Sequence, residues 1–203
     1  MTKHHPKETT LAEYAAGTLD EGRSLVVTEH LSRCAHCREF IASFENIGGV
    51  MMEAVEPVDM SPGARDAVLR QLGTIEASTT KTARKSVKDY SLGPWRWIGP
   101  GLHARSVGVP SQGGSRVFML KAAPGIELPK HEHRGTELTC ILSGAFTHEG
   151  GRYGPGDCDD ADEDDFHSPV IDNGEECVCL VAMQGNIVFQ SLLGRMIQPF
   201  IRL

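Results

Sequence analysis

The 203-residue chain lacks several features that would place it in a special class of protein. No apolar run approaches the roughly 20 residues that a membrane-spanning helix needs, and the first residues, MTKHHPKE, have no apolar core of a secretory signal. Six cysteines are few for this length, which indicates reduced thiols in a cytoplasm and not a disulfide scaffold. The formal net charge of -7 argues against direct DNA binding. We therefore expect a cytoplasmic protein with no membrane or DNA partner.

The residues before position 77 have the apolar spacing of helices, and they predict four short ones. Asp20 is the expected N-cap of the second helix, and Ser61 and Pro62 are expected at the N-cap and first helical position of the fourth. Gly48 and Gly49 should weaken or bend the third helix. Four short helices form a thin core, so we expect a further stabilising element such as a bound metal.

From residue 77 onward the helical spacing of apolar residues is lost. Residues 77–90, ASTTKTARKSVKDY, show no apolar periodicity and predict a linker. Later segments such as SRVFMLKAA, TELTCILSGAF and ECVCLVAM alternate with Gly- and Pro-rich turns, which is typical of an all-β sandwich or barrel. We therefore predict an α + β protein of two domains: a helical domain over residues 1–76, a linker over 77–90, and an all-β domain over 91–203.

The motif His30-x3-Cys34-x2-Cys37 predicts a metal site in the helical part. The surrounding stretch reads as helical, and residues four apart share a helix face, so His30 and Cys34 should point the same way with Cys37 one turn later. One imidazole and two thiolates suit zinc, which takes four ligands in a tetrahedron. His4 or His5 could supply the fourth. The alternatives are ordinary buried thiols or a redox Cys-x-x-Cys pair, but such a pair should follow a strand in a βαβ unit, and none is visible.

A second metal site is predicted in the β part, from the spacing Gly-x5-His131-x-His133-x3-Glu137-x6-Gly. Alternate residues of a strand share a face, so the two histidines should project together. Glu137 should return to the same point after a turn. Two imidazoles and a carboxylate suit a divalent transition metal, and we expect zinc first, with manganese, iron or nickel as alternatives.

This spacing matches the first motif of the cupin family at every defined position, which implies a jelly-roll barrel. The second cupin motif is looser in this chain. Gly154-Pro155-Gly156 supplies the expected turn, and His167 is the natural fourth ligand, although the gap before it is stretched to ten residues. His148 is the competing histidine, but it should lie at the end of a hairpin.

The zinc motif, preceded by a distant histidine, resembles the signature of the zinc-binding anti-sigma family. Its combination with a cupin resembles the ChrR-type members of that family over nearly the whole chain, including YAAGTL, SLVVTEHLSRCAHC, HEHRGTELTCILSGAF and IQPFIRL. The resemblance implies His5, not His4, as the fourth zinc ligand. It carries over two ligand sets: His5, His30, Cys34 and Cys37 for zinc, and His131, His133, Glu137 and His167 for the cupin metal.

The same resemblance implies a function. The helices would wrap an extracytoplasmic-function sigma factor and block its access to RNA polymerase, while the cupin would sense singlet oxygen or organic peroxide. The cupin could also mediate a homodimer. The competing interpretation is a metal-dependent cupin enzyme, an oxygenase or isomerase, with an accessory zinc-binding interaction domain. The sequence shows metal ligands but neither a lid nor a catalytic base, so we expect no enzyme and keep cupin catalysis as the alternative.

Overall fold

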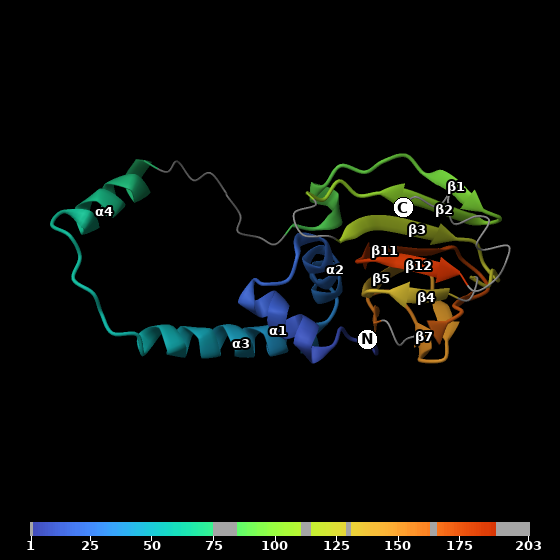
Figure 1. The fold of residues 1–203 in the computed structure, drawn as a ribbon, viewed down its shortest axis with the longest axis horizontal. Helices are drawn as coiled ribbons and strands as arrows, with labels where there is room; N and C mark the ends of the chain where they lie inside the picture. Colours follow the sequence, from blue (N-terminus) through green and yellow to red (C-terminus); the bar gives the residue numbers. More distant parts are fainter. Residues whose placement is uncertain (1, 75–84, 111–114, 129–130, 163–165, 190–203) are drawn as a thin grey trace.

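The structure is a computed structural model that describes residues 2–74, 85–110, 115–128, 131–162 and 166–189. Helices form the N-terminal part and strands form the remainder, so the predicted α + β architecture is confirmed (Figure 1). The helices are α1 (Glu8–Ala16), α2 (Glu21–Leu31), α3 (Ala35–Glu53), α4 (Ala64–Thr74) and the short 3-10 helix η1 (Val87–Asp89).

Capping residues set where the first helices begin. Asp20 is the N-cap of α2, as predicted, and its Oδ1 accepts hydrogen bonds from the backbone N–H groups of Gly22 and Arg23 at 3.0 and 3.1 Å. Cys34 is the N-cap of α3, and its Sγ accepts from the Cys37 backbone N–H at 3.4 Å. Such caps satisfy N–H groups that have no partner within their own helix.

One sequence-based expectation about helix limits was wrong, and another stays a prediction. The α3 helix runs through Gly48 and Gly49 without interruption. A glycine pair costs helix stability without preventing the helical conformation, so the expected weakening or bending stays a prediction. The α4 helix begins at Ala64 and not at Pro62. The Ala64 N–H donates to the Ser61 carbonyl at 3.1 Å, which closes a turn before the helix and delays its start.

The β part contains three antiparallel sheets. A six-stranded sheet has the order β1-β2-β3-β11-β5-β8, and two three-stranded sheets have the orders β10-β6-β7 and β12-β4-β9. The strands are β1 (Arg96–Gly99), β2 (Leu102–Ser106), β3 (Arg116–Ala122), β4 (His131–Arg134), β5 (Glu137–Ser143), β6 (Phe146–His148), β7 (Gly151–Tyr153), β8 (Cys158–Ala161), β9 (Phe166–His167), β10 (Val170–Ile171), β11 (Cys177–Met183) and β12 (Asn186–Phe189).

The three apolar segments singled out in the sequence form the centre of this β part. They contain β3, β5 and β11, and β11 pairs with both of the others. Their apolar side chains fill two buried clusters, one of which lies among β-strand residues such as Phe118, Ile141 and Val181. The strand predictions are therefore confirmed, and the sheets are those of a cupin barrel.

The second buried cluster joins the helices to the six-stranded sheet. It contains Leu25 and Val26 of α2 together with Leu138 and Leu180 of the sheet. The approach is close enough to require glycine at position 22, because a Cβ there would stand 2.7 Å from a methyl carbon of Val117. Figure 1 shows α2 beside the strands, whereas the distal part of α3 and α4 stand away from them.

The end of the predicted linker also contacts α2. The backbone N–H of Val87 donates to the Glu29 carboxylate at 2.7 Å, and the Tyr90 hydroxyl donates to the Glu21 carboxylate at 2.8 Å. Residues 75–84, most of the predicted linker, lie outside the described residues. Within the described part of the chain, the helices are too short or too polar to cross a membrane.

Candidate metal centres

The sequence motif spans two helices and not one, which corrects the expectation that His30 and Cys34 share a helical face. The α2 helix ends at Leu31, residues 32 and 33 form a turn, and Cys34 has an extended backbone ahead of α3. The four side chains nevertheless converge. One ligand atom from each of His5, His30, Cys34 and Cys37 can be chosen so that all four lie within 4.8 Å of one another. We call these four residues the His/Cys cluster.

The tautomer and the burial of the His30 ring suit it to bind a cation. Its side chain is fully buried, and its Nδ1 lies 2.6 Å from the carbonyl oxygen of Gly156. A carbonyl can only accept, so Nδ1 carries the proton and Nε2 presents its lone pair. That Nε2 is buried and has no hydrogen-bond partner among the residues that the structure describes. Burial lowers the pKa of His30, which keeps the ring neutral as a metal ligand must be.

The two cysteines complete the sulfur side of the cluster. His5 Nδ1 lies 3.4 Å from the Sγ of Cys34 and 3.3 Å from the Sγ of Cys37. Both cysteines are buried, and burial raises the pKa of Cys37 to about 12. A Cys37 thiolate would therefore be unstable without a nearby cation, and a bound divalent metal would supply that charge.

His5 joins the cluster because the N-terminal segment runs along the cupin. The Cys158 N–H donates to the His4 carbonyl at 3.1 Å, and both the Lys3 and His4 N–H groups donate to Asp157. Burial works to raise the pKa of Asp157, but the backbone donors of Gly154, Lys3 and His4 outweigh it and the pKa is lowered. The neighbouring His4 stacks on Tyr153 with ring centres 3.9 Å apart, so the structure brings His5 and not His4 to the cluster.

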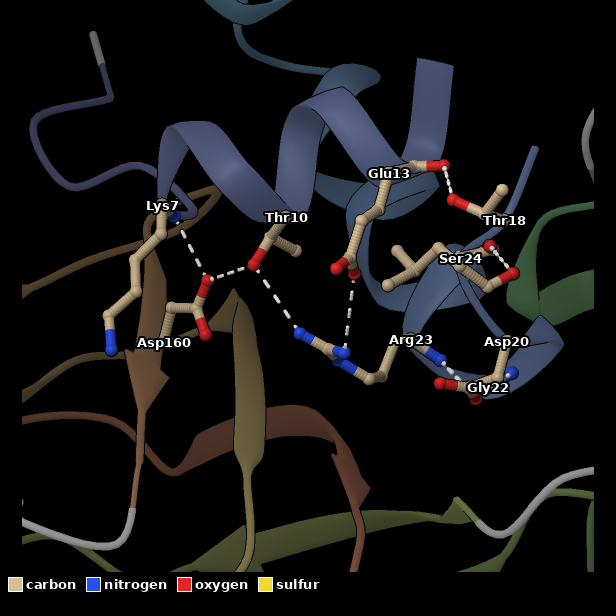
Figure 2. A network of polar contacts seen from close by, with 10 residues as sticks. Lys7, Thr10, Glu13, Thr18, Asp20, Gly22, Arg23, Ser24 and Asp160 are labelled. Atoms are coloured by element: carbon tan, nitrogen blue, oxygen red, sulfur yellow. Dashed lines mark hydrogen bonds and ion pairs between the residues drawn. The ribbon is translucent and has the colours of Figure 1, made fainter. Parts of the chain in front are cut away.

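A further polar network holds the first helix in place behind this segment (Figure 2). Asp160 of β8 accepts hydrogen bonds from the Lys7 N–H at 2.9 Å and from the Thr10 hydroxyl at 2.8 Å. The N-cap of α1 is Lys7, whose side chain makes no capping bond, so Asp160 supplies negative charge near that helix start. Arg23 of α2 faces Thr10 and Glu13 in the same view.

The donor set fits zinc. Metal bonds of about 2.0–2.3 Å in a tetrahedron place neighbouring ligand atoms about 3.3–3.8 Å apart. The sulfur-to-nitrogen distances of 3.3 and 3.4 Å lie in this range before any ion is placed. Two nitrogens and two sulfurs match a closed structural site, and the orphaned Nε2 of His30 gains a partner. Zinc here would crosslink the N-terminal segment, α2 and α3.

The predicted cupin ligands lie on three neighbouring segments. His131 and His133 are both in β4, His167 is in β9, and Glu137 is the first residue of β5. The backbones of His131 and His167 face each other directly in the β4–β9 pairing. Glu137 accepts a hydrogen bond from the Thr139 hydroxyl at 3.1 Å. The three histidine side chains lie outside the described atoms, so this ligand set stays a prediction.

The competing histidine has other partners. His148 ends β6, as expected, and its Nε2 lies 3.2 Å from the Asp159 carboxylate. Its Nδ1 accepts from the Gly150 N–H at 2.9 Å. Both ring nitrogens are thus engaged within the protein, which favours His167 over His148 as the fourth cupin ligand.

The four cysteines outside the His/Cys cluster are buried thiols in the sheet. Cys140 and Cys158 face each other in the β5–β8 pairing, and Cys177 and Cys179 lie in β11. Burial raises the pKa of Cys177 to about 12, and burial also raises the pKa of Cys158 and of Cys179. Thiols so protonated are poor nucleophiles, so these residues read as core and not as reactive groups.

The geometry defines a class of protein: a helical module with a His/Cys metal cluster, packed on a cupin barrel. Residues 9–38 match the family described as a putative zinc-finger, and residues 83–186 match the family described as the ChrR cupin-like domain. Anti-sigma-E factor ChrR of Cereibacter sphaeroides is 37% identical over 211 residues, which cover 99% of both proteins. The chain belongs to the ChrR family of zinc-binding anti-sigma factors with a C-terminal cupin domain.

A solved relative has the same architecture. In the crystal structure of Rhodobacter sphaeroides SigE in complex with the anti-sigma ChrR, the matching chain is 37% identical, with a TM-score of 0.76. The match covers 91% of the present chain and 100% of that one. That relative is an anti-sigma factor, a regulator of transcription.

Proposed function

We propose that this chain binds and inhibits an extracytoplasmic-function sigma factor through its N-terminal zinc-binding helices. The proposal further holds that it releases the sigma factor in response to singlet oxygen or related oxidative stress, sensed through the metal-binding cupin. The observation that carries it is an exposed apolar stripe on α3 and α4. The solved complex of ChrR with SigE supports the choice of partner.

The stripe begins on α3. Phe44, Ile47 and Met51 recur at the spacing of one helical face, and Ile47 is 56% exposed. A surface helix normally turns such a stripe toward a core. Here the helix has already left the cupin, so the stripe is available to another molecule (Figure 1). We use the name apolar stripe for these three residues together with the exposed apolar residues of α4.

The apolar stripe continues beyond α3. Val68, Leu69 and Leu72 of α4 are all more than half exposed, and Val58 and Met60 between the helices are more exposed still. So many exposed large apolar side chains on two successive helices are unusual on a protein that acts alone and support an interaction site. Methionines suit such a surface, because their flexible side chains adapt to a partner.

The cupin half of the proposal rests on the predicted ligand set. A divalent metal held by His131, His133, Glu137 and His167 would make this barrel the sensory part, with zinc first and manganese, iron or nickel as alternatives. A cytoplasmic location follows from the proposed partner, which acts on RNA polymerase. Direct DNA binding has no part in the proposal, and a homodimer through the cupin stays a prediction.

The test is a binding measurement with full-length protein. Each extracytoplasmic-function sigma factor of the source organism is co-expressed, and complexes are recovered and assayed for inhibition of transcription. Ile47→Asp places a charge on the apolar stripe and should weaken binding at least about tenfold, the effect of losing one interface hot spot. Ala42→Asp is the matched control, because Ala42 is exposed on the opposite face of the same helix. Equal binding by both variants, or no sigma factor bound by the wild type, would contradict the proposal.

A further inference from the structure

The turn between β7 and β8, residues 154–157, lies directly behind the His/Cys cluster although it belongs to the cupin. Its Gly156 carbonyl accepts the hydrogen bond from His30. Gly156 has a φ of +92°, and a Cβ there would stand 2.9 Å from Thr2 and 3.1 Å from Arg33. Only glycine allows the turn to approach both the N-terminal segment and the end of α2 so closely.

The next residue, Asp157, holds the N-terminal segment itself. It is 6% exposed, and its Oδ1 accepts from the backbone N–H groups of Lys3 at 2.6 Å and His4 at 3.1 Å. Its Oδ2 accepts from the N–H of Gly154 at 2.9 Å, which fixes the carboxylate within the turn. A buried carboxylate with three N–H donors is a strong anchor, because charged acceptors form the stronger hydrogen bonds.

The first residue of β8 completes the attachment. The Cys158 N–H donates to the His4 carbonyl at 3.1 Å, so His4 is held by the cupin on both its N–H and its C=O. His5 follows at once and reaches the two sulfurs at 3.3 and 3.4 Å. Near the chain terminus, a segment without such contacts would sample many conformations, and His5 would meet the metal only part of the time.

We propose that Asp157 of the cupin positions His5 and thereby sets how long the N-terminal site retains its zinc. The proposal rests on the assignment of the His/Cys cluster as a zinc site. Groups that hydrogen-bond directly to a metal ligand typically contribute about 10- to 100-fold to metal affinity. Asp157 acts one residue away, through the backbone of Lys3 and His4, so we expect the lower end of that range. The cupin is then part of the zinc site in structural terms, although it supplies none of the four ligands. By linkage, zinc binding in turn strengthens the attachment of the N-terminal segment to the cupin.

The experiment measures metal release from the full-length protein loaded with Co²⁺, which replaces zinc and reports on its ligands. Of the two proposed metal sites, the His/Cys cluster has sulfur ligands and the predicted cupin set has none, so the sulfur-to-cobalt charge-transfer absorption follows the cluster and not the cupin metal. After excess EDTA is added, the decay of this absorption should be about 10-fold faster in Asp157→Asn than in the wild type. Asparagine keeps the shape, but its NH2 group must face at least one of the three N–H donors.

Asp172→Asn is the matched control. Asp172 also accepts hydrogen bonds, from Thr147 and Arg152, but it lies after β10 and outside the cluster. Lys3→Pro is the second variant, and it removes one N–H donor to Asp157 without changing the cupin. It guards against the case in which Asp157→Asn fails to fold, which circular dichroism would reveal.

Release within about twofold of wild type in Lys3→Pro, and in a folded Asp157→Asn, would overturn the proposal and leave the zinc site intact. A wild-type protein with no sulfur-to-cobalt absorption would overturn the zinc site itself, and the proposal with it. Fast release in both variants, with wild-type release in Asp172→Asn, is the expected result. Because the readout is spectroscopic, it does not depend on any sigma factor.

Discussion

The helical part divides at Ile41 into two halves: the first half buries its apolar side chains, and the second half leaves them exposed. In residues 2–41, α1, α2 and the first turns of α3 bury apolar side chains against one another and against the cupin sheet. In residues 42–72 no described side chain is buried, although the apolar periodicity continues. Similar sequence patterns therefore end in a core in one half and in an exposed stripe in the other.

The difference shows what each half depends on. The first half is stabilised from within the chain by the core that it shares with the cupin, and a metal bound to its His/Cys cluster would add to this stability. Most apolar side chains of the second half stay exposed in the free protein, since burying them fully requires another molecule. We expect substitutions in the first half to change stability and substitutions in the second half to change partner binding.

The largest expected effect comes from Cys37→Ser. A structural zinc site of this kind contributes on the order of 10 kcal/mol of binding free energy, and loss of one thiolate removes most of it. The variant should lose one equivalent of metal, unfold at lower temperature and inhibit the sigma factor poorly. Metal analysis, thermal unfolding and an inhibition assay measure the three effects.

Cys177→Ser is the control for that variant. Cys177 is equally buried, but it lies in β11 and outside the cluster. It should lose some stability and keep its zinc. A Cys37→Ser protein that retains a full equivalent of cluster metal and full inhibition would remove Cys37 from the ligand set.

A pair of leucines tests the contrast between the halves directly. Leu25 is 2% exposed in the shared core, and Leu72 is 59% exposed on α4. Leu25→Ala should lower the free energy of unfolding by about 2–5 kcal/mol, whereas Leu72→Ala should change it by less than about 0.5 kcal/mol. Leu72→Ala should weaken binding of the sigma factor more than Leu25→Ala does. Urea titration measures the free energy of unfolding of both variants, and a binding assay measures their affinity for the sigma factor. Equal losses of stability in the two variants would contradict the proposed difference between the halves.

The last prediction concerns Glu137→Ala, whose main effect should be on sensing and not on the fold. This change removes one predicted ligand from a cupin whose sheet keeps its own buried core, so the fold and the basal inhibition should survive while the cupin metal is lost. A sigma-dependent reporter in cells exposed to singlet oxygen should then fail to respond. Glu175→Ala, an exposed change in the same domain, should respond normally. If a metal-free Glu137→Ala protein responds normally, the cupin metal is not needed for sensing.

Much of this could be predicted from local patterns. The four helices, the central strands and the N-cap at Asp20 follow from apolar spacing and from residues whose side chains satisfy nearby N–H groups. The spacing of His30, Cys34 and Cys37 suggested a metal, and the family resemblance selected His5. Local reasoning failed where a turn competed with a helix. It joined His30 and Cys34 on one helix, and it began α4 two residues early, because apolar spacing does not show where a local turn ends or precedes a helix.

The sequence by itself therefore determined the order of the elements and the kinds of metal ligand, since those depend on neighbours a few residues apart. Only the tertiary structure decided that α2 shares its core with the cupin, that Gly156 and Asp157 support a cluster more than 100 residues earlier in the chain, and that His5 reaches the sulfurs. These are contacts between distant segments, and no local pattern of side chains records them. They form because burying two complementary surfaces and pairing their polar groups lowers the free energy, however far apart these surfaces lie along the chain.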